Sequence, residues 1–167
     1  MKPIKLLNLL AWAVLSTTAG FLLPKIVIAN GGAIPVSSLN IIVTLPAIGI
    51  VLLAMAIPMF QYRRALAAML KDPSKPNPKR VNPFYAVRLV VLAKAIAISG
   101  AIFVGWHIGL VWLQLTSPIV PSTTGQNAFG LLGSAVMLVC AIIVERICRI
   151  TDSGDGDVAN NSEASAA

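Results

Sequence analysis

The sequence predicts an all-α membrane protein in which four transmembrane helices form an antiparallel bundle. Of its 167 residues, 57% are hydrophobic and 11% are charged, and the mean hydropathy is +0.84. A soluble domain carries about 25% charged residues, so this composition excludes an ordinary soluble enzyme and a disordered chain. Four long apolar runs are separated by short polar segments, without the alternation that the strands of a membrane β-barrel require.

Each apolar run is close to or longer than the roughly 20 residues that a helix needs to cross the hydrocarbon core of a bilayer. The helices are expected at about residues 6–23, 39–60, 86–115 and 128–144. They belong to one domain, residues 1–150, in which a basic, proline-rich loop at 61–85 joins the second and third helices. The tail, residues 151–167, is rich in Ser, Gly, Asp, Asn and Ala, and we expect it to be disordered.

Local signals refine the helix ends. Within the central loop, Gln61 to Lys71 is expected to extend the second helix as a helical segment. Asn82 followed by Pro83 is typical of an N-cap with proline at the first helical position, and should begin the third helix. Ser37 and Ser38 offer side-chain oxygens that can cap the second helix.

The first apolar run leaves an alternative open. Lys2 and Lys5 precede it, and small residues occur at Ala19 and Gly20, which is also the pattern of a signal peptide. The run is long for a signal peptide, and three further spans follow it. A retained first helix is therefore the simpler interpretation.

Lysine and arginine lie almost wholly on one side of the predicted helices, while residues 116–127 contain no charge. By the positive-inside rule, both termini and the central loop are expected in the cytoplasm. The basic residues of the second helix end and the loop are also placed to contact anionic lipid headgroups. These are Arg63, Arg64, Lys71, Lys75, Lys79 and Arg80. A soluble basic face with interleaved aromatic residues is absent, so no nucleic-acid partner is expected.

Small residues recur at every fourth position of the third helix, a pattern that lets another helix backbone approach closely. This small-residue face consists of Ala93, Ala97, Ala101, Gly105 and Gly109. The fourth helix has a matching narrow face with coiled-coil-like spacing. Its members are Gly130, Ser134, Met137, Ala141, Glu145 and Cys148. We expect the third and fourth helices to pack through these two faces.

Two charges lie within the third and fourth helices. Lys94 and Glu145 fall at similar depth in antiparallel helices and on the faces expected to meet, so we predict that they form an ion pair. The alternative is that Lys94 extends to the lipid headgroups and Glu145 is solvated. The predicted role of the pair is structural and not catalytic.

His107, the only histidine, lies seven residues before Gln114 and therefore on the same face of the third helix. Such a polar pair indicates either a pathway through the membrane or a hydrogen bond between helices, and the second is favoured. No metal or cofactor is predicted, because a metal site would need more ligands. Cys140 and Cys148, eight residues apart, suit neither a disulfide nor a zinc site.

The stretch from Arg88 to Gly109 (RLVVLAKAIAISGAIFVGWHIG), with the ending VERICRI at Val144 to Ile150, resembles an actinobacterial membrane family catalogued as domain of unknown function 3180. Matching features are the LAKA run, the G-x-x-x-G end of the third helix and the E-R-x-C-R close of the fourth. The resemblance covers nearly the whole chain. It implies a four-helix, multi-pass protein of the bacterial inner (plasma) membrane without an assigned activity.

No catalytic motif occurs, so the sequence favours a non-enzymatic membrane protein that packs with itself or a partner, or acts as a scaffold. The alternative is a small oligomeric transporter or channel, for which Lys94, Glu145 and His107 are the candidate pathway residues. An enzyme acting at the membrane ranks third, because it would need several polar groups at one depth. A dry, closed bundle would favour the first hypothesis, and a wet cavity reaching Lys94 the second.

Overall fold

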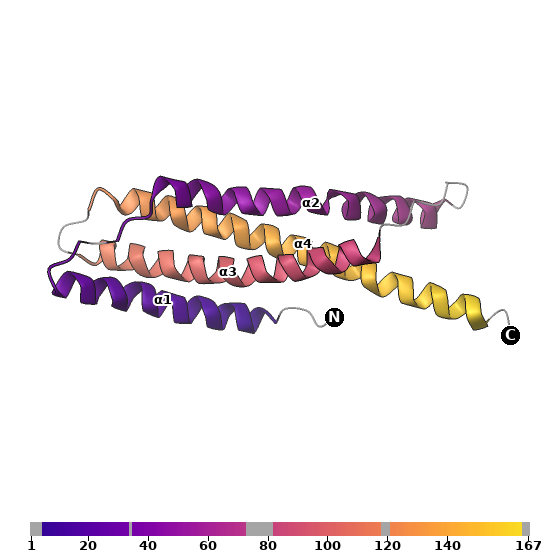
Figure 1. Ribbon diagram of the computed structural model, residues 1–167, viewed down its shortest axis with the longest axis horizontal. Helices are drawn as coiled ribbons and strands as arrows, with labels where there is room; N and C mark the ends of the chain where they lie inside the picture. Colours follow the sequence, from indigo (N-terminus) through magenta and orange to yellow (C-terminus); the bar gives the residue numbers. More distant parts are fainter. Residues whose placement is uncertain (1–4, 34, 73–81, 118–120, 165–167) are drawn as a thin grey trace.

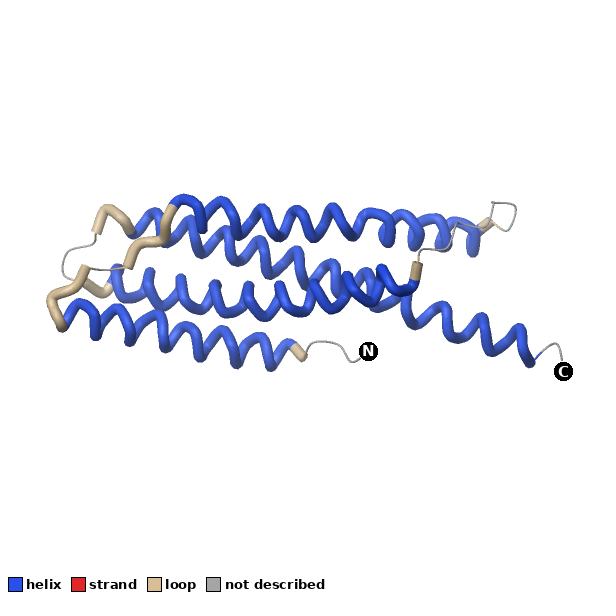
Figure 2. The backbone as a smooth tube through the Cα atoms, in the orientation of Figure 1, coloured by secondary structure: helices blue, strands red, loops and turns tan. Residues whose placement is uncertain are grey.

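A computed structural model of the chain describes residues 5–33, 35–72, 82–117 and 121–164. It contains four helices, shown in Figure 1: α1 (Leu6–Ala29), α2 (Leu39–Lys71), α3 (Pro83–Leu115) and α4 (Thr124–Ala164). All four are long and apolar enough to cross a membrane. The backbone traced in Figure 2 has no strand in the part that the structure describes, and the predicted all-α four-helix architecture is confirmed.

The helices do not pack in the order in which they follow one another. The central pair is α3 and α4, with α1 packed on α3 and α2 packed on α4. Because successive helices reverse direction, α3 and α4 are antiparallel, while each outer helix runs parallel to the inner helix that it covers (Figure 1). The starts of α1 and α3 lie at one end of the bundle, which we call the basic end because Arg63, Arg64 and Arg88 lie near it.

The first helix is longer than expected. It continues through Pro24 to Ala29, where the sequence had suggested an end near Leu23. Proline removes one backbone donor, but a membrane helix tolerates this when its neighbours accommodate the freed carbonyl. Pro24 is buried, and the apolar residues that follow it extend the helix. The chain then turns at Gly31, whose φ of 79° is the left-handed conformation that glycine adopts without strain.

The third helix begins as the sequence predicts. Asn82 is its N-cap, with its side-chain oxygen 3.0 Å from the backbone nitrogen of Phe84, and Pro83 occupies the first helical position. The second helix also extends to Lys71, as expected.

The fourth helix departs furthest from expectation. It begins at Thr124 and continues to Ala164, so the segment from Thr151 onward is helical where disorder was expected. An established helix adds one backbone hydrogen bond for each residue that joins it, whereas a new helix must first form a costly nucleus. The membrane-spanning part of α4 provides that nucleus for the residues that follow it.

The core is built mainly from small and aliphatic side chains contributed by α2, α3 and α4. Ala93, Ala97 and Ala101 of α3 are fully buried in one cluster with Ala141 and Val144 of α4. Alanines in contact let the two central helices approach closely, which strengthens van der Waals packing where no hydrophobic driving force acts between helices. Among the described residues, the buried polar side chains are His107, Gln114 and Asn127 toward one end of the bundle, Glu145 toward the other, and Ser134 between them.

Candidate functional site

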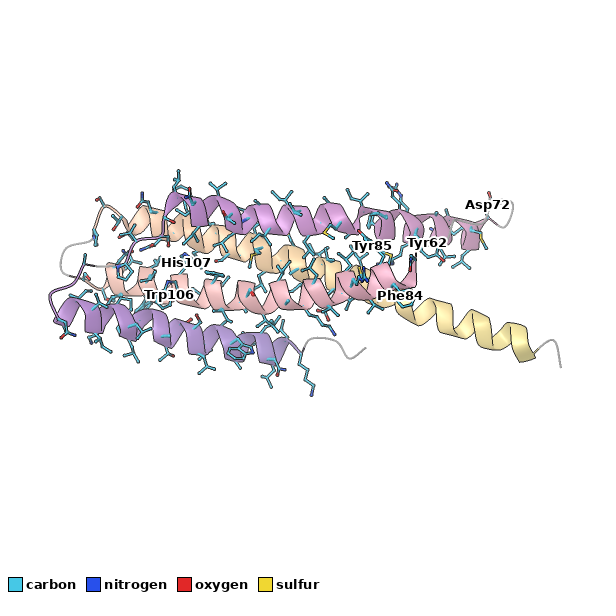
Figure 3. The ribbon with its side chains drawn as sticks, viewed as in Figure 1. Tyr62, Asp72, Phe84, Tyr85, Trp106 and His107 are labelled. Carbon is cyan, nitrogen blue, oxygen red and sulfur yellow. The ribbon has the colours of Figure 1, made fainter. Side chains whose placement is uncertain are left out.

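A cluster of buried polar groups lies at the end of the bundle opposite the basic end, and His107 of α3 is at its centre (Figure 3). The side chain is 1% exposed. Its Nδ1 lies 2.7 Å from the carbonyl oxygen of Phe103, one turn earlier. A carbonyl can only accept, so Nδ1 holds the hydrogen, and in the neutral ring Nε2 is the acceptor. The hydroxyl of Ser37, 3.0 Å from Nε2, then donates to the ring.

Asn127, near the start of α4, forms hydrogen bonds with the link that contains Ser37. Its side chain is fully buried. Its Oδ1 accepts a hydrogen bond from the backbone nitrogen of Ser37 at 2.9 Å, and its Nδ2 donates to the carbonyl oxygen of Pro35 at 3.4 Å. The cluster therefore joins three parts of the chain: the link before α2, the last turns of α3 and the first turn of α4.

Gly130 makes room for the imidazole. A Cβ atom at this position would come 2.6 Å from Cδ2 of His107, which real Cβ contacts do not allow. One turn of α4 thus provides both the hydrogen-bonding side chain of Asn127 and, at Gly130, the space that the imidazole of His107 occupies. The fit between the ring and this glycine fixes the contact between α3 and α4 at this end.

His107 and Gln114 are both buried on α3, but they do not form a hydrogen bond with each other. Both ring nitrogens of His107 bond elsewhere, and the fully buried amide of Gln114 has no hydrogen-bond partner among the described residues. Seven residues of helix rise about 10 Å, which exceeds the length of a hydrogen bond between side chains that point the same way. The partner of His107 comes instead from a distant link.

Two residues of this cluster were not recognised as such from the sequence. Ser37 was expected to cap α2, but Ser38 occupies the N-cap position and neither serine makes the expected side-chain cap. Asn127 was overlooked, although the buried face of α4 runs back to it: Ser134, Gly130 and Asn127 follow the same alternation of three and four residues. Extending that spacing by one step would have found it. No spacing rule links Ser37 to His107.

The small-residue face of α3 serves two neighbours rather than one. Ala93, Ala97 and Ala101 lie in the core cluster that includes α4. In contrast, Gly105 and Gly109 receive α1: a Cβ at Gly109 would come 2.5 Å from the carbonyl oxygen of Thr17, and one at Gly105 would overlap the carbonyl oxygen of Ala13. The expectation that all five residues meet the fourth helix was wrong for the two glycines. The α4 backbone approaches α3 closely at Gly100, beside Leu138.

Side-chain hydroxyls support the α1–α3 contact. The hydroxyl of Ser16 donates to the carbonyl oxygen of Ile102 at 2.6 Å, one turn from Gly105. Gly20 also meets α3 closely, because a Cβ there would lie 2.5 Å from the carbonyl oxygen of Trp106. Glycines on both helices therefore bring the two backbones together, as in other membrane helix pairs with small residues four apart.

Lys94 and Glu145 flank the central interface nearer the basic end. Glu145 is 6% exposed and Lys94 is half-buried. Lys94 follows the buried Ala93, and Glu145 follows the buried Val144 of the same core cluster. Both charges thus lie beside the α3–α4 contact, and their pairing stays a prediction.

A groove opens between α2 and α3, where these two helices touch only slightly. It has a volume of about 420 Å³ and a lining that is almost entirely apolar. The lining includes Val51 and Met55 of α2 and Leu92 and Ile96 of α3. At the end of the groove, the hydroxyl of Tyr85 donates to the carbonyl oxygen of Met55 at 2.6 Å and joins α3 to α2.

The remaining candidate groups are the cysteines of α4 and the basic residues of α2. Cys140 and Cys148 are buried, free thiols on α4. In the described ranges, His, Cys, Asp and Glu side chains form no group of three that could hold a metal ion. Arg63, Arg64 and Lys71 lie along the end of α2, whereas Lys75, Lys79 and Arg80 fall outside the described residues.

Comparison with known proteins gives one match. A family model described as Protein of unknown function (DUF3180) matches residues 9–152, which include most of each helix. No curated protein matches the chain, and no solved structure does.

Proposed function

We propose that this chain, which belongs to the DUF3180 family of proteins of unknown function, is a non-enzymatic membrane protein that packs against a partner protein or a second copy of itself. The chain is a multi-pass membrane protein with four helices that are able to span a bilayer. The proposal assigns the partner contact to the outer helices, α1 and α2.

The observation that supports this role is the unequal burial of the four helices. Within their most apolar stretches, 17% of α1 and 22% of α2 are buried, compared with 44% of α4. The residues of α1 that approach another helix most closely, from Ala13 to Gly20, pack against α3 within the same chain. A partner would therefore meet the outward-facing aliphatic side chains, such as Leu15 of α1 and Ile50 of α2.

A transporter or channel remains the second candidate, because it would explain why charged and polar side chains lie within the spans. The arrangement of those groups favours the first proposal. The polar cluster around His107 lies 13 residues from Lys94, a rise of about 20 Å along α3. Between them, the face toward α4 holds the buried alanines Ala97 and Ala101 in close packing, which supports a dry bundle rather than a continuous polar path.

The Ser37–His107 hydrogen bond also has the polarity of a nucleophile and its base, since a hydroxyl donates to an imidazole nitrogen. The non-enzymatic proposal assigns it a structural role, because this bond joins the link before α2 to α3, beside the Asn127 bonds that join the same link to α4. A fluorophosphonate probe, which reacts with activated serines, should leave Ser37 unlabelled in the full chain. Labelling that disappears in both Ser37→Ala and His107→Ala would favour a hydrolase instead.

We also propose that the basic end faces the cytoplasm, with both chain termini on that side. The support is the gathering of Arg63, Arg64 and Arg88 at one end, as the positive-inside rule describes. A cysteine at Gly31, in a chain whose native cysteines are replaced by alanine, should react with an impermeant maleimide only from outside the cell. Labelling only from the cytoplasmic side would reverse the orientation.

The packing role is tested by photo-crosslinking residues placed at Leu15 and Ile50 in cells. We expect a discrete protein adduct of constant mass from at least one of them, and none from the buried control position Leu110. Lipid adducts at both outward positions, together with ion or solute flux through purified protein in vesicles, would contradict the scaffold role and favour transport.

A further inference from the structure

The groove between α2 and α3 has the dimensions of one lipid chain. Its α2 wall runs from Val43 to Met55, which at 1.5 Å per residue is about 18 Å. A single leaflet occupies about half of a hydrocarbon core that is about 30 Å thick. The volume of about 420 Å³ also falls in the range of small-molecule sites in proteins.

The Leu92 end of the groove lies at the depth of the leaflet at the basic end, while Val43 lies one turn from the start of α2 at the opposite end. Trp112 marks the opposite interface, because tryptophan and tyrosine gather at the two membrane surfaces. Leu92 lies 20 residues from Trp112, or about 30 Å, at the limit of the hydrocarbon core. Arg88 lies one turn further, about 36 Å away and thus at headgroup depth.

The positively charged Arg88 lies at the depth of the lipid headgroups. Arg88 precedes Leu92 by four residues, and Leu92 precedes Ile96 by four, so the three share one face of α3. The Arg88 side chain is exposed, one helical turn before the groove residue Leu92. Tyr85, whose hydroxyl donates to the carbonyl oxygen of Met55, lies at the same end of the groove (Figure 3). Arginine binds phosphate oxygens through two parallel hydrogen bonds.

From these observations we propose that the α2–α3 groove is a binding site for an anionic glycerophospholipid, with one acyl chain between the helices and the phosphate at Arg88. The apolar walls supply affinity for the chain, and Arg88 supplies the preference for negative charge. The site does not depend on the proposed packing role, since the partner surface lies on the outward faces of α1 and α2.

Two adjacent residues of α2 provide a matched pair for the test. Val51 lines the groove and is 59% exposed, whereas Ile50 is 61% exposed and lies outside it. Val51→Trp would fill the groove, and Ile50→Trp would add the same bulk on the outward face. For charge, Arg88→Gln is matched by Arg64→Gln, which removes an exposed arginine that lies, at 100° per residue, on the side of α2 away from the groove.

The experiment is native mass spectrometry of the full chain in mild detergent, titrated with phosphatidylglycerol or with phosphatidylcholine of the same chains. We expect one retained phosphatidylglycerol, bound about tenfold more weakly by Val51→Trp and within twofold of wild type by Ile50→Trp. Arg88→Gln should lower the preference for phosphatidylglycerol about fivefold, the effect of one surface cation, and Arg64→Gln should not.

Equal effects of the two tryptophans, or equal binding of both lipids by wild type and Arg88→Gln, would overturn the proposal. A change of oligomeric state in Val51→Trp alone would also overturn it, because the groove would then hold a second copy of the chain. Arg88→Gln changes an exposed side chain and keeps the test valid even if the tryptophan variants unfold.

Discussion

The two faces that α3 turns toward α1 and α2 are built on opposite principles. Toward α1, Gly105 and Gly109 let the backbones touch, and Ser16 adds a hydrogen bond between the helices. Toward α2, Leu92 and Ile96 stand between the helices, and the groove stays open except at Tyr85. Side-chain size at a few positions thus decides whether a membrane helix closes on its neighbour or leaves a surface for lipid.

The largest expected effect comes from closing the space at Gly105. A methyl group there meets the carbonyl oxygen of Ala13, which cannot move without shifting α1. Gly105→Ala should therefore destabilise the protein by about 3 kcal/mol, the upper range for overpacking, as measured by equilibrium unfolding in mixed micelles. Gly125→Ala is the control, because its Cβ meets nothing within 4 Å. Equal stabilities for the two variants would remove the basis of the comparison.

A second close contact joins α3 to α4 through His107. Gly130→Ala should cost about 2 kcal/mol, because the added methyl overlaps the imidazole. The cost should fall by more than half when His107→Ala is already present, and a double-mutant cycle measures that coupling. Additive effects would show that the ring and the glycine do not contact each other.

The charges beside the same interface give a smaller effect. Lys94→Met and Glu145→Gln should show a coupling of about 1 kcal/mol in a double-mutant cycle if the two side chains pair. These two variants test whether an ion pair adds to the close packing of α3 and α4 at the basic end. Purely additive changes in unfolding free energy would refute the ion pair.

Gln114 offers a change that should stabilise. Its amide is fully buried without a hydrogen-bond partner among the described residues, a state that costs about 1–3 kcal/mol. Gln114→Leu should raise the unfolding free energy by about 1 kcal/mol, while Gln126→Leu, on the exposed side of α4, should change it little. A loss of stability in Gln114→Leu would show that the amide forms a stabilising hydrogen bond.

The smallest effect concerns the hydrogen bond between Tyr85 and Met55, which crosses from α3 to α2 beside the groove. Tyr85→Phe removes the hydroxyl that donates to Met55 and should cost about 1 kcal/mol or less. Tyr62→Phe is the control, because the Tyr62 hydroxyl has no hydrogen bond within the described ranges. A loss as large as that of Gly105→Ala would show that α2 and α3 depend on this contact, contrary to the comparison.

Hydropathy was sufficient to predict the four helices, because a bilayer imposes length and apolar character on each span. Cap chemistry was sufficient for the start of α3, where Asn82 and Pro83 act through local geometry. The predicted end of the first helix, near residue 23, falls short of Ala29, because the buried Pro24 is accommodated within α1.

The candidate sites were harder to predict because they depend on which helices become neighbours. The spacing of Gly105 and Gly109 indicated a close contact, but nothing in α3 alone distinguishes α1 from α4 as the helix that makes it. Ser37 reaches His107 across 70 positions of sequence, and no periodic pattern reports such a contact. The groove is likewise a product of packing order, since it exists only because α2 sits on α4.

The distance between α1 and α3 tests the central claim most directly. Spin labels at the outward-facing positions Leu15 and Ile102 would report that distance by pulsed electron resonance, and labels at Ile50 and Ile102 would report the distance from α2 to α3. We expect Gly105→Ala to lengthen the first mean distance and to leave the second unchanged. An unchanged first distance, or equal changes in both, would contradict the claim that glycine at this position sets the α1–α3 contact.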